Sequence, residues 1–282
     1  MTSWINTKTR SKLPTKELGY SFSTTQAGFC SQFNNFFYAY LYAVSKQRKL
    51  FVCERNSALG FSVPFLKSVF KDNNNIEYTN YQLAQHPLYD SKVVYPYLYS
   101  LTHTELREKA RKFFGYNDLK LQECDNFLSN YANIPKKFDL GVHIRSGDKI
   151  TTREMGVISI ASYVTAIKDM QKKSGLKTLN IFVMTDNFSL FQKLKELADS
   201  SWSLFTLDSP TQVGHVQENF NTYLTRKEKQ YEFNKFLTEL LIMQNCPMII
   251  CTLSSNIGRY LYLTVESLEY FKSIDVPTFA PI

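Results

Sequence analysis

The sequence predicts an α/β protein in which parallel strands alternate with helices, and three observations lead to this class. Short apolar runs suited to strands take turns with stretches whose apolar residues recur every three or four positions. Several runs in the second half are apolar at nearly every position, which is typical of strands buried on both faces of a parallel sheet. The 282 residues, 44% of them hydrophobic, suffice for a sizeable core in one large or two modest domains.

The first half begins with a predicted strand, helix and strand. Residues 20–24 form the first strand, and a Gln-Ala-Gly turn at residues 26–28 follows it. The next helix is predicted from an apolar stripe with helical spacing, made of Phe33, Phe36, Phe37, Tyr40, Leu41 and Val44. The run KLFVC at residues 49–53 is the second strand and completes a βαβ unit.

The middle of the chain has a weaker pattern, because polar and aromatic residues mix between residues 56 and 131 without a clear period. We predict only two helices there, at residues 104–114 and 119–131. The sequence IPKK at residues 134–137 is predicted to be a connector, since proline and adjacent charges seldom lie inside a central strand.

Beyond this connector the alternation is regular. Apolar runs predict strands at residues 138–145, 179–185, 202–207 and 247–252. Apolar stripes predict helices at residues 159–173, 188–197, 233–244 and 257–265. This half is therefore expected to be a doubly wound sheet, with its ligand at the carboxyl ends of the strands.

Charge and cysteine content limit the partners and the compartment. The net charge of +8 favours an anionic partner, although a merely soluble basic surface explains it as well. A nucleic-acid-binding module is less favoured, because most aromatic residues fall on predicted core faces and no nucleic-acid motif is present. Five cysteines without a CxxC pair indicate reduced thiols, and no signal peptide or membrane-spanning run is visible, so we expect a soluble, cytoplasmic protein.

The first candidate cluster follows the predicted strand at residues 138–145. Period-two alternation places His143 and Arg145 on the same side of that strand. Gly147 permits a sharp turn, and Asp148 and Lys149 lie at its tip. An arginine and a lysine that converge at a strand end could clamp a phosphate or diphosphate, although Asp148 could equally form a surface ion pair with a neighbouring cation.

The second cluster is Ser254, Ser255 and Asn256, between the last predicted strand and helix. These residues are good helix N-caps, and the free N–H groups of the helix start would also attract an anion. Asp186 follows another strand and could be a ligand residue or a helix cap, while Glu239 could be solvated or could accept the paired N–H donors of guanine. No DxD pair occurs and the four histidines are dispersed, so we expect no metal.

In this order and spacing, the sequences HIRSGDK, MTDN and CTLSSNIGR resemble the three motifs of the GDP-fucose-dependent fucosyltransferase superfamily, in particular the α-1,6-fucosyltransferases and the rhizobial chitin-oligosaccharide enzymes. Residues 28–52 resemble that family's first glycine turn, helix and strand. The resemblance implies a GT-B fold of two Rossmann-like domains that face a cleft. Residues 1–134 would form the acceptor side, residues 135–266 would bind the nucleotide sugar, and residues 267–282 would pack back on the first domain.

The resemblance also implies an inverting, metal-independent transfer of a sugar, with L-fucose from GDP-fucose favoured, to a hydroxyl of a glycan acceptor. Another nucleotide sugar such as UDP-xylose is the alternative donor. Arg145 would hold the β-phosphate, His143 would lie beside the nucleotide and Glu239 would read guanine. The donor-binding set is Gly28, His143, Arg145, Asp186, Glu239, Ser254, Ser255 and Asn256, and the catalytic set is Arg145, Asp148, Lys149 and Glu154.

Two departures from the family pattern concern this catalytic set. The family has a pair of arginines where this chain has Arg145 and Ser146. The position of the family's proposed base is taken by Arg153, with Glu154 one residue further on. Asp148 and Glu154 are therefore the two candidates for the group that takes the acceptor proton.

Overall fold

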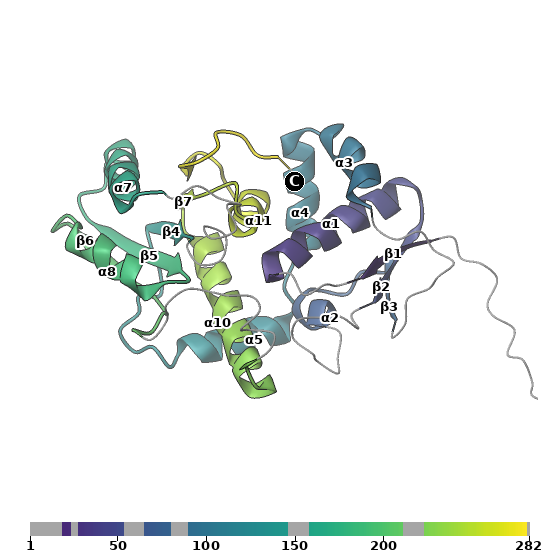
Figure 1. Ribbon diagram of the computed structural model, residues 1–282, viewed down its shortest axis with the longest axis horizontal. Coiled ribbons are helices and arrows are strands. Elements are labelled where there is room, and N and C mark those ends of the chain that lie inside the picture. The colour runs from purple at the N-terminus through teal and green to yellow at the C-terminus, as the bar shows by residue number, and fades with distance from the viewer. Residues whose placement is uncertain are drawn as a thin grey trace, which may run out of the picture.

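Two parallel sheets with helices packed between them and around them make up the fold (Figure 1). The computed structural model describes residues 19–23, 28–53, 65–79, 90–145, 158–210 and 223–280. We call the chain up to residue 134 the first half and the remainder the second half. In Figure 1 the smaller sheet, from the first half, lies on the right, and the larger one lies on the left.

The smaller sheet has three parallel strands in the order β1 (Gly19–Ser23), β2 (Lys49–Cys53) and β3 (Ile76–Thr79). Helix α1 (Phe29–Ser45) connects β1 to β2, so the predicted βαβ unit is confirmed. The first half also contains α2 (Phe65–Val69), α3 (Ser91–Tyr99), α4 (His103–Phe113) and α5 (Asp118–Leu128). Of these elements, α4 and α5 match the two helices predicted in the middle of the chain, whereas β3, α2 and α3 were not predicted.

The larger sheet has five parallel strands in the order β6-β5-β4-β7-β8. They are β4 (Leu140–Ile144), β5 (Leu179–Thr185), β6 (Trp202–Phe205), β7 (Met248–Cys251) and β8 (Phe271–Ser273). When these five strands are numbered by their order in the chain, the sheet has the 3-2-1-4-5 arrangement of a Rossmann-like sheet. The strand order reverses between β4 and β7, so the switch point lies at the carboxyl ends of these two strands.

Alternate residues along the strands face opposite layers of helices. Val142, Val183 and Ile250 pack with α7 (Ile160–Ser174) and α8 (Phe188–Glu196). On the other face, Phe182 and Ile249 belong to the core that contains α10 (Arg226–Asn245) and α11 (Asn256–Thr264). Helices therefore cover both faces, which confirms the doubly wound second half.

The largest core runs without interruption from the first half into the second. Phe33 of α1 contacts Tyr260 of α11, with ring centroids 5.9 Å apart, and the Tyr116 and Tyr260 hydroxyls are 2.8 Å apart. Arg107 of α4 donates from Nε to the carbonyl oxygen of Tyr262 (2.9 Å), and its guanidinium also donates to the carbonyl of Val265. The first half therefore holds α11 by both apolar and polar contacts.

The last residues contact both halves. Strand β8 pairs with β7, and Phe279 stacks on Tyr262 with ring centroids 4.6 Å apart. Phe279 also makes an edge contact with His103 at the start of α4, at 5.9 Å. The division of the chain at residues 134 and 266 stays a prediction. In the described part of the chain no helix combines the length and the apolar character that crossing a bilayer requires.

Candidate functional site

The candidate site lies at the switch point of the larger sheet, where β4 and β7 are neighbours. Arg145 follows β4, and the segment of residues 252–255 leads from β7 into α11. In open α/β sheets ligands bind in the crevice outside the carboxyl ends of the strands at such a reversal. The topology therefore brings Arg145 to the same edge of the sheet as a segment about a hundred residues further along the chain.

Arg145 forms an ion pair with Asp186, which follows the adjacent strand β5. Their side chains are 13% and 10% exposed, so the pair is largely withdrawn from water. The cap of α8 is Asn187, whose side chain accepts from the Ser189 N–H (3.0 Å), and the reading of Asp186 as the helix cap is therefore wrong. The structure instead uses Asp186 to fix the direction of the Arg145 guanidinium.

His143, two residues earlier, is buried in β4. Burial, together with the positive charge of the neighbouring Arg145, lowers the pKa of its imidazole to about 3, so the ring is neutral at physiological pH. Its Nδ1 has no hydrogen-bond partner among the residues that the structure describes. A neutral ring with an unsatisfied nitrogen is available for a polar contact but cannot act as a cation here.

The start of α11 is the second component of the site. Ser255 caps the helix, and its Oγ accepts from the Ile257 N–H at 3.2 Å. Asn34 of α1 donates to the carbonyl oxygen of Asn256 (3.1 Å). Gly258 lets the helix approach the end of β7, because a Cβ there would lie 1.9 Å from the carbonyl oxygen of Thr252. The amino end of α11, where the helix dipole is positive, therefore lies close to the end of β7, the strand that pairs with Arg145's strand β4.

Ser254 has a different role from its two neighbours. Its hydroxyl and its backbone N–H both donate to the carboxylate of Asp275 (N to Oδ2, 3.1 Å). Asp275 also accepts from Leu253 N–H (2.9 Å), from the Ser273 hydroxyl (2.7 Å) and from its neighbour's backbone N–H (2.7 Å). Sequence reasoning missed Asp275, because it follows a strand of only three residues in a segment that carried no motif.

Gly28 is the N-cap residue of α1, the helix that packs against α11. Its backbone is extended (φ −60°, ψ 155°), and among the described residues no side chain caps the first turn of this helix. Phe29 packs on Phe233 and Phe236 of α10, with ring centroids 4.7 and 5.2 Å away. The amino end of α1 therefore lies against α10, and Asn34, further along α1, contacts the start of α11.

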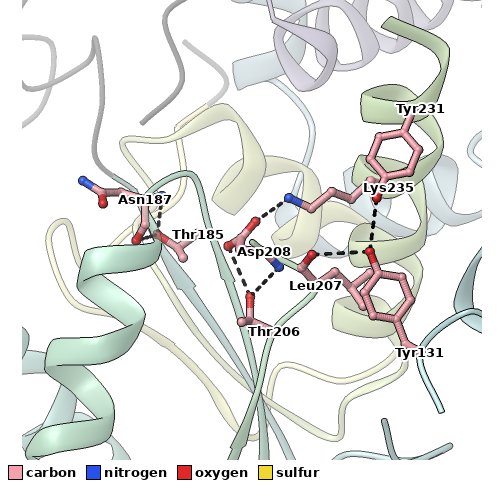
Figure 2. A network of polar contacts seen from close by, with 8 residues as sticks. All are labelled: Tyr131, Thr185, Asn187, Thr206, Leu207, Asp208, Tyr231 and Lys235. Carbon is pink, nitrogen blue, oxygen red and sulfur yellow. Dashed lines mark hydrogen bonds and ion pairs between the residues drawn. The ribbon is translucent and has the colours of Figure 1, made fainter. Parts of the chain in front are cut away.

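A polar network extends the site toward α10 (Figure 2). Asp208, just beyond β6, forms a buried ion pair with Lys235 of α10, with side chains 0% and 6% exposed. The Thr206 hydroxyl donates to Asp208 Oδ2 (3.2 Å), and the hydroxyls of Tyr131 and Tyr231 lie 3.5 Å apart beside this pair. A buried pair of opposite charges therefore links α10 to the segment just beyond β6.

Glu239, one helical turn after Lys235, is 5% exposed, so the reading of this carboxyl as solvated is wrong. Burial raises its pKa well above the usual range, Asp208 and Glu232 raise it further, and Lys235 opposes them. No hydrogen-bond partner for Glu239 Oε1 occurs in the described ranges. A buried carboxyl with an unsatisfied oxygen is costly unless a ligand supplies the missing donor.

The remaining catalytic candidates, Asp148, Lys149 and Glu154, lie outside the described residues, as does the turn at Gly147. The described ranges contain no group of three or more histidine, cysteine, aspartate or glutamate residues that could hold a metal ion. What the structure brings together is Arg145 with Asp186, and the α11 start with α1. Glu239 lies with Lys235 and Asp208.

Comparison with known proteins bears on the fold. No family model matches the chain and no curated protein matches it. POFUT1 in complex with GDP superposes with a TM-score of 0.56 at 11% identity, over 92% of this chain and 98% of that one. Fucosyltransferase NodZ from Bradyrhizobium gives a TM-score of 0.50 at 14% identity, over 89% and 94% of the two chains. The chain has a GT-B fold.

In this GT-B fold the smaller Rossmann-like sheet has three strands and the larger one has five, and all of them are parallel. The two sheets share the core that is built around α1, α10 and α11. The switch point of the larger sheet contains Arg145, Asp186 and the start of α11. The resemblance of the sequence motifs to those of GDP-fucose-dependent fucosyltransferases predicts the nucleotide at these residues.

Proposed function

We propose that this protein is a glycosyltransferase that binds a guanosine diphosphate sugar at the switch point and transfers the sugar to a glycan hydroxyl, with L-fucose as the favoured sugar. The observation that carries the proposal is the position of the Arg145–Asp186 pair and the α11 start at the strand-order reversal. GDP is the ligand bound in POFUT1 and in NodZ α-1,6-fucosyltransferase, whose folds this chain shares with TM-scores of 0.56 and 0.50.

The diphosphate would be held by fixed charges and dipoles. Asp186 orients the planar Arg145 guanidinium, whose fork of N–H donors suits a phosphate. The amino ends of α1, at Gly28, and of α11, at Ser255 and Asn256, would add the positive ends of two helix dipoles. These groups need no rearrangement when the sugar–phosphate bond breaks, so they can stabilise the charge that develops on the leaving diphosphate.

Glu239 and His143 would recognise the nucleoside. Because its pKa is raised, Glu239 would lose its proton when guanine binds. The carboxylate could then accept both the N1–H and the N2–H donors on the Watson–Crick edge of guanine, and Lys235, held by Asp208, would favour that ionised form. His143 would lie beside the nucleotide with a neutral ring. Uracil presents one N–H between two carbonyls on the corresponding edge, so this pair of contacts discriminates between the two bases.

The transfer itself is proposed to be inverting and metal-independent. Lys149 would add positive charge beside Arg145, and Asp148 or Glu154 would take the proton of the acceptor hydroxyl. Residues 1–134 would hold the acceptor across the cleft from residues 135–266. In-line placement of the hydroxyl and the anomeric carbon would supply much of the remaining rate enhancement. Full transfer in excess EDTA is the expected result, and loss of transfer restored by a divalent cation would contradict the metal-independent step.

A donor screen tests the assignment. GDP and GDP-fucose are expected to stabilise the protein against thermal unfolding and to bind in calorimetry, whereas UDP and UDP-xylose should do neither. Stabilisation by UDP but not by GDP would reject the guanine reading in favour of the alternative donor. Stabilisation by none of the four would reject the proposed function.

The Arg145→Ala variant tests the phosphate clamp. Loss of a charge-assisted hydrogen bond to phosphate should weaken GDP binding about 10- to 100-fold and abolish transfer, with the circular dichroism spectrum unchanged. The control is Arg111→Ala, which removes an exposed arginine that donates to the carbonyl oxygen of Glu266, beyond the far end of α11 (3.1 Å). Near-wild-type turnover by Arg145→Ala would contradict the assignment.

A further inference from the structure

The carboxylate of Asp275 clasps the loop that leads into α11. Because β7 and β8 are parallel neighbours, the segments after them run side by side, and Asp275 comes two residues after β8. Its Oδ1 accepts from Leu253 N–H (2.9 Å) and the Ser273 hydroxyl (2.7 Å). Its Oδ2 accepts from Ser254 N–H (3.1 Å) and from the Ser254 hydroxyl. One side chain therefore ties together the ends of both strands.

These contacts determine what the loop can offer a ligand. The N–H groups of Leu253 and Ser254 and the Ser254 hydroxyl are all directed at Asp275, so they do not point toward the crevice. Ser255, the next residue, caps α11. The clasp therefore orients the loop so that the donors presented to the crevice begin at the amino end of α11.

The charge state of the clasp suits this task. Burial acts to raise the pKa of Asp275, but the hydrogen bonds from Ser254 and Ser273 and from backbone N–H groups outweigh it, so the pKa lies below its usual range. The carboxylate is therefore ionised at neutral pH and accepts from all five donors. An amide in its place would keep one acceptor oxygen and turn an NH₂ group toward donors.

We propose that Asp275 is a positioning residue of the donor site, which holds the β7–α11 loop in the shape that aims the amino end of α11 at the diphosphate. The inference rests on the proposed function and deepens it. Ser254 belongs to the clasp and acts on the diphosphate through it, whereas Ser255 and Asn256 lie at the contact itself. The C-terminal segment thereby completes a site whose other parts come from three earlier motifs.

Separate measurements of pyrophosphate and guanosine binding test this role. In Asp275→Asn the affinity for pyrophosphate and for GDP should fall about tenfold, because misdirected N–H groups lose a charge-assisted contact, while the affinity for guanosine stays unchanged. Ser254→Ala removes one donor of the clasp and should show the same pattern to a smaller extent. Added to Asp275→Asn, it should weaken pyrophosphate binding no further.

The matched control is Asp169→Asn, which breaks the exposed ion pair with Lys272 of β8 (3.0 Å) and should leave all three affinities unchanged. An Asp275→Asn variant that binds pyrophosphate as tightly as the wild type would overturn this inference and leave the proposed function standing. Parallel loss of guanosine and pyrophosphate binding in Ser254→Ala would also overturn it, since that pattern indicates general disruption. Wild-type protein that binds neither GDP nor pyrophosphate would overturn the proposed function and this inference with it.

Discussion

Replacement of Gly258 by alanine would place a methyl group where α11 meets the end of β7. The added Cβ would lie 1.9 Å from the carbonyl oxygen of Thr252 and 2.8 Å from its carbonyl carbon. Both atoms belong to the backbone, so no side chain can rotate away to make room. Since Cβ atoms keep at least 3.0 Å from such neighbours, the helix and the loop must separate by about a further 1 Å.

The expected cost follows from two opposing effects. Overpacking of this kind costs about 1–3 kcal/mol, and contact with rigid backbone places Gly258→Ala at the upper end. Alanine regains about 1 kcal/mol of helix propensity over glycine. The net loss of unfolding free energy is therefore about 2 kcal/mol, which corresponds to a fall in Tm of about 4–8 °C.

Thermal and urea unfolding measure this loss, and GDP titration measures its effect on the site. The control is Gly115→Ala, whose added Cβ would meet only the Lys71 side chain, at 3.5 Å, and which should change stability by less than about 0.5 kcal/mol. GDP binding should weaken in Gly258→Ala because the start of α11 moves. A Gly258→Ala protein with wild-type Tm and wild-type GDP affinity would refute the close approach of helix and loop.

Two further predictions concern buried charges. The pKa of His143 is about 3 in the fold against an ordinary value of 6.5, so its stabilising contribution is complete above pH 6.5 and is lost as the pH falls, by about 2 kcal/mol at pH 5. Urea unfolding at pH 7 and pH 5 should show this loss in the wild type and not in His143→Asn, and equal losses in both would contradict it. Lys235→Met should cost about 3–5 kcal/mol because it leaves Asp208 buried without its cation, and adding Asp208→Leu should restore most of that stability. A double variant as unstable as the sum of the two single variants would show that the pair is not coupled.

The elements that could be predicted from the sequence are those whose buried apolar residues recur at regular spacing. Strands β4 and β5 are buried at almost every position, and an apolar run of that kind has few alternatives to a central parallel strand. The same holds for α7, whose buried residues Tyr163, Ile167 and Met170 recur at helical spacing. The order of these elements was enough to predict a ligand site at the carboxyl ends of the strands.

The elements that sequence reasoning missed lack such a pattern. Strand β3 is partly exposed along its whole length, β8 has three half-exposed residues, and α3 contains Pro96 in its interior. The buried polar contacts of helix α10 do not show in the sequence pattern, for a different reason. It packs against α5, α11 and the larger sheet at once, so Lys235 and Glu239 are buried beside the apolar stripe rather than opposite it. What distinguishes these two residues from surface charges is their position beside Asp208, which is distant in the sequence.

Helix α11 connects the two halves in a way that limits how such a protein can be recombined. Its first residue, Asn256, is held by Asn34, and its last turn is held by Arg107, both from the first half. The helix start that we propose to lie at the diphosphate is thus kept in place by residues of the first half. A chimera that exchanges the second half for that of another GT-B protein would keep the proposed donor site only if Asn34 and Arg107 find matching carbonyl groups in the incoming helix.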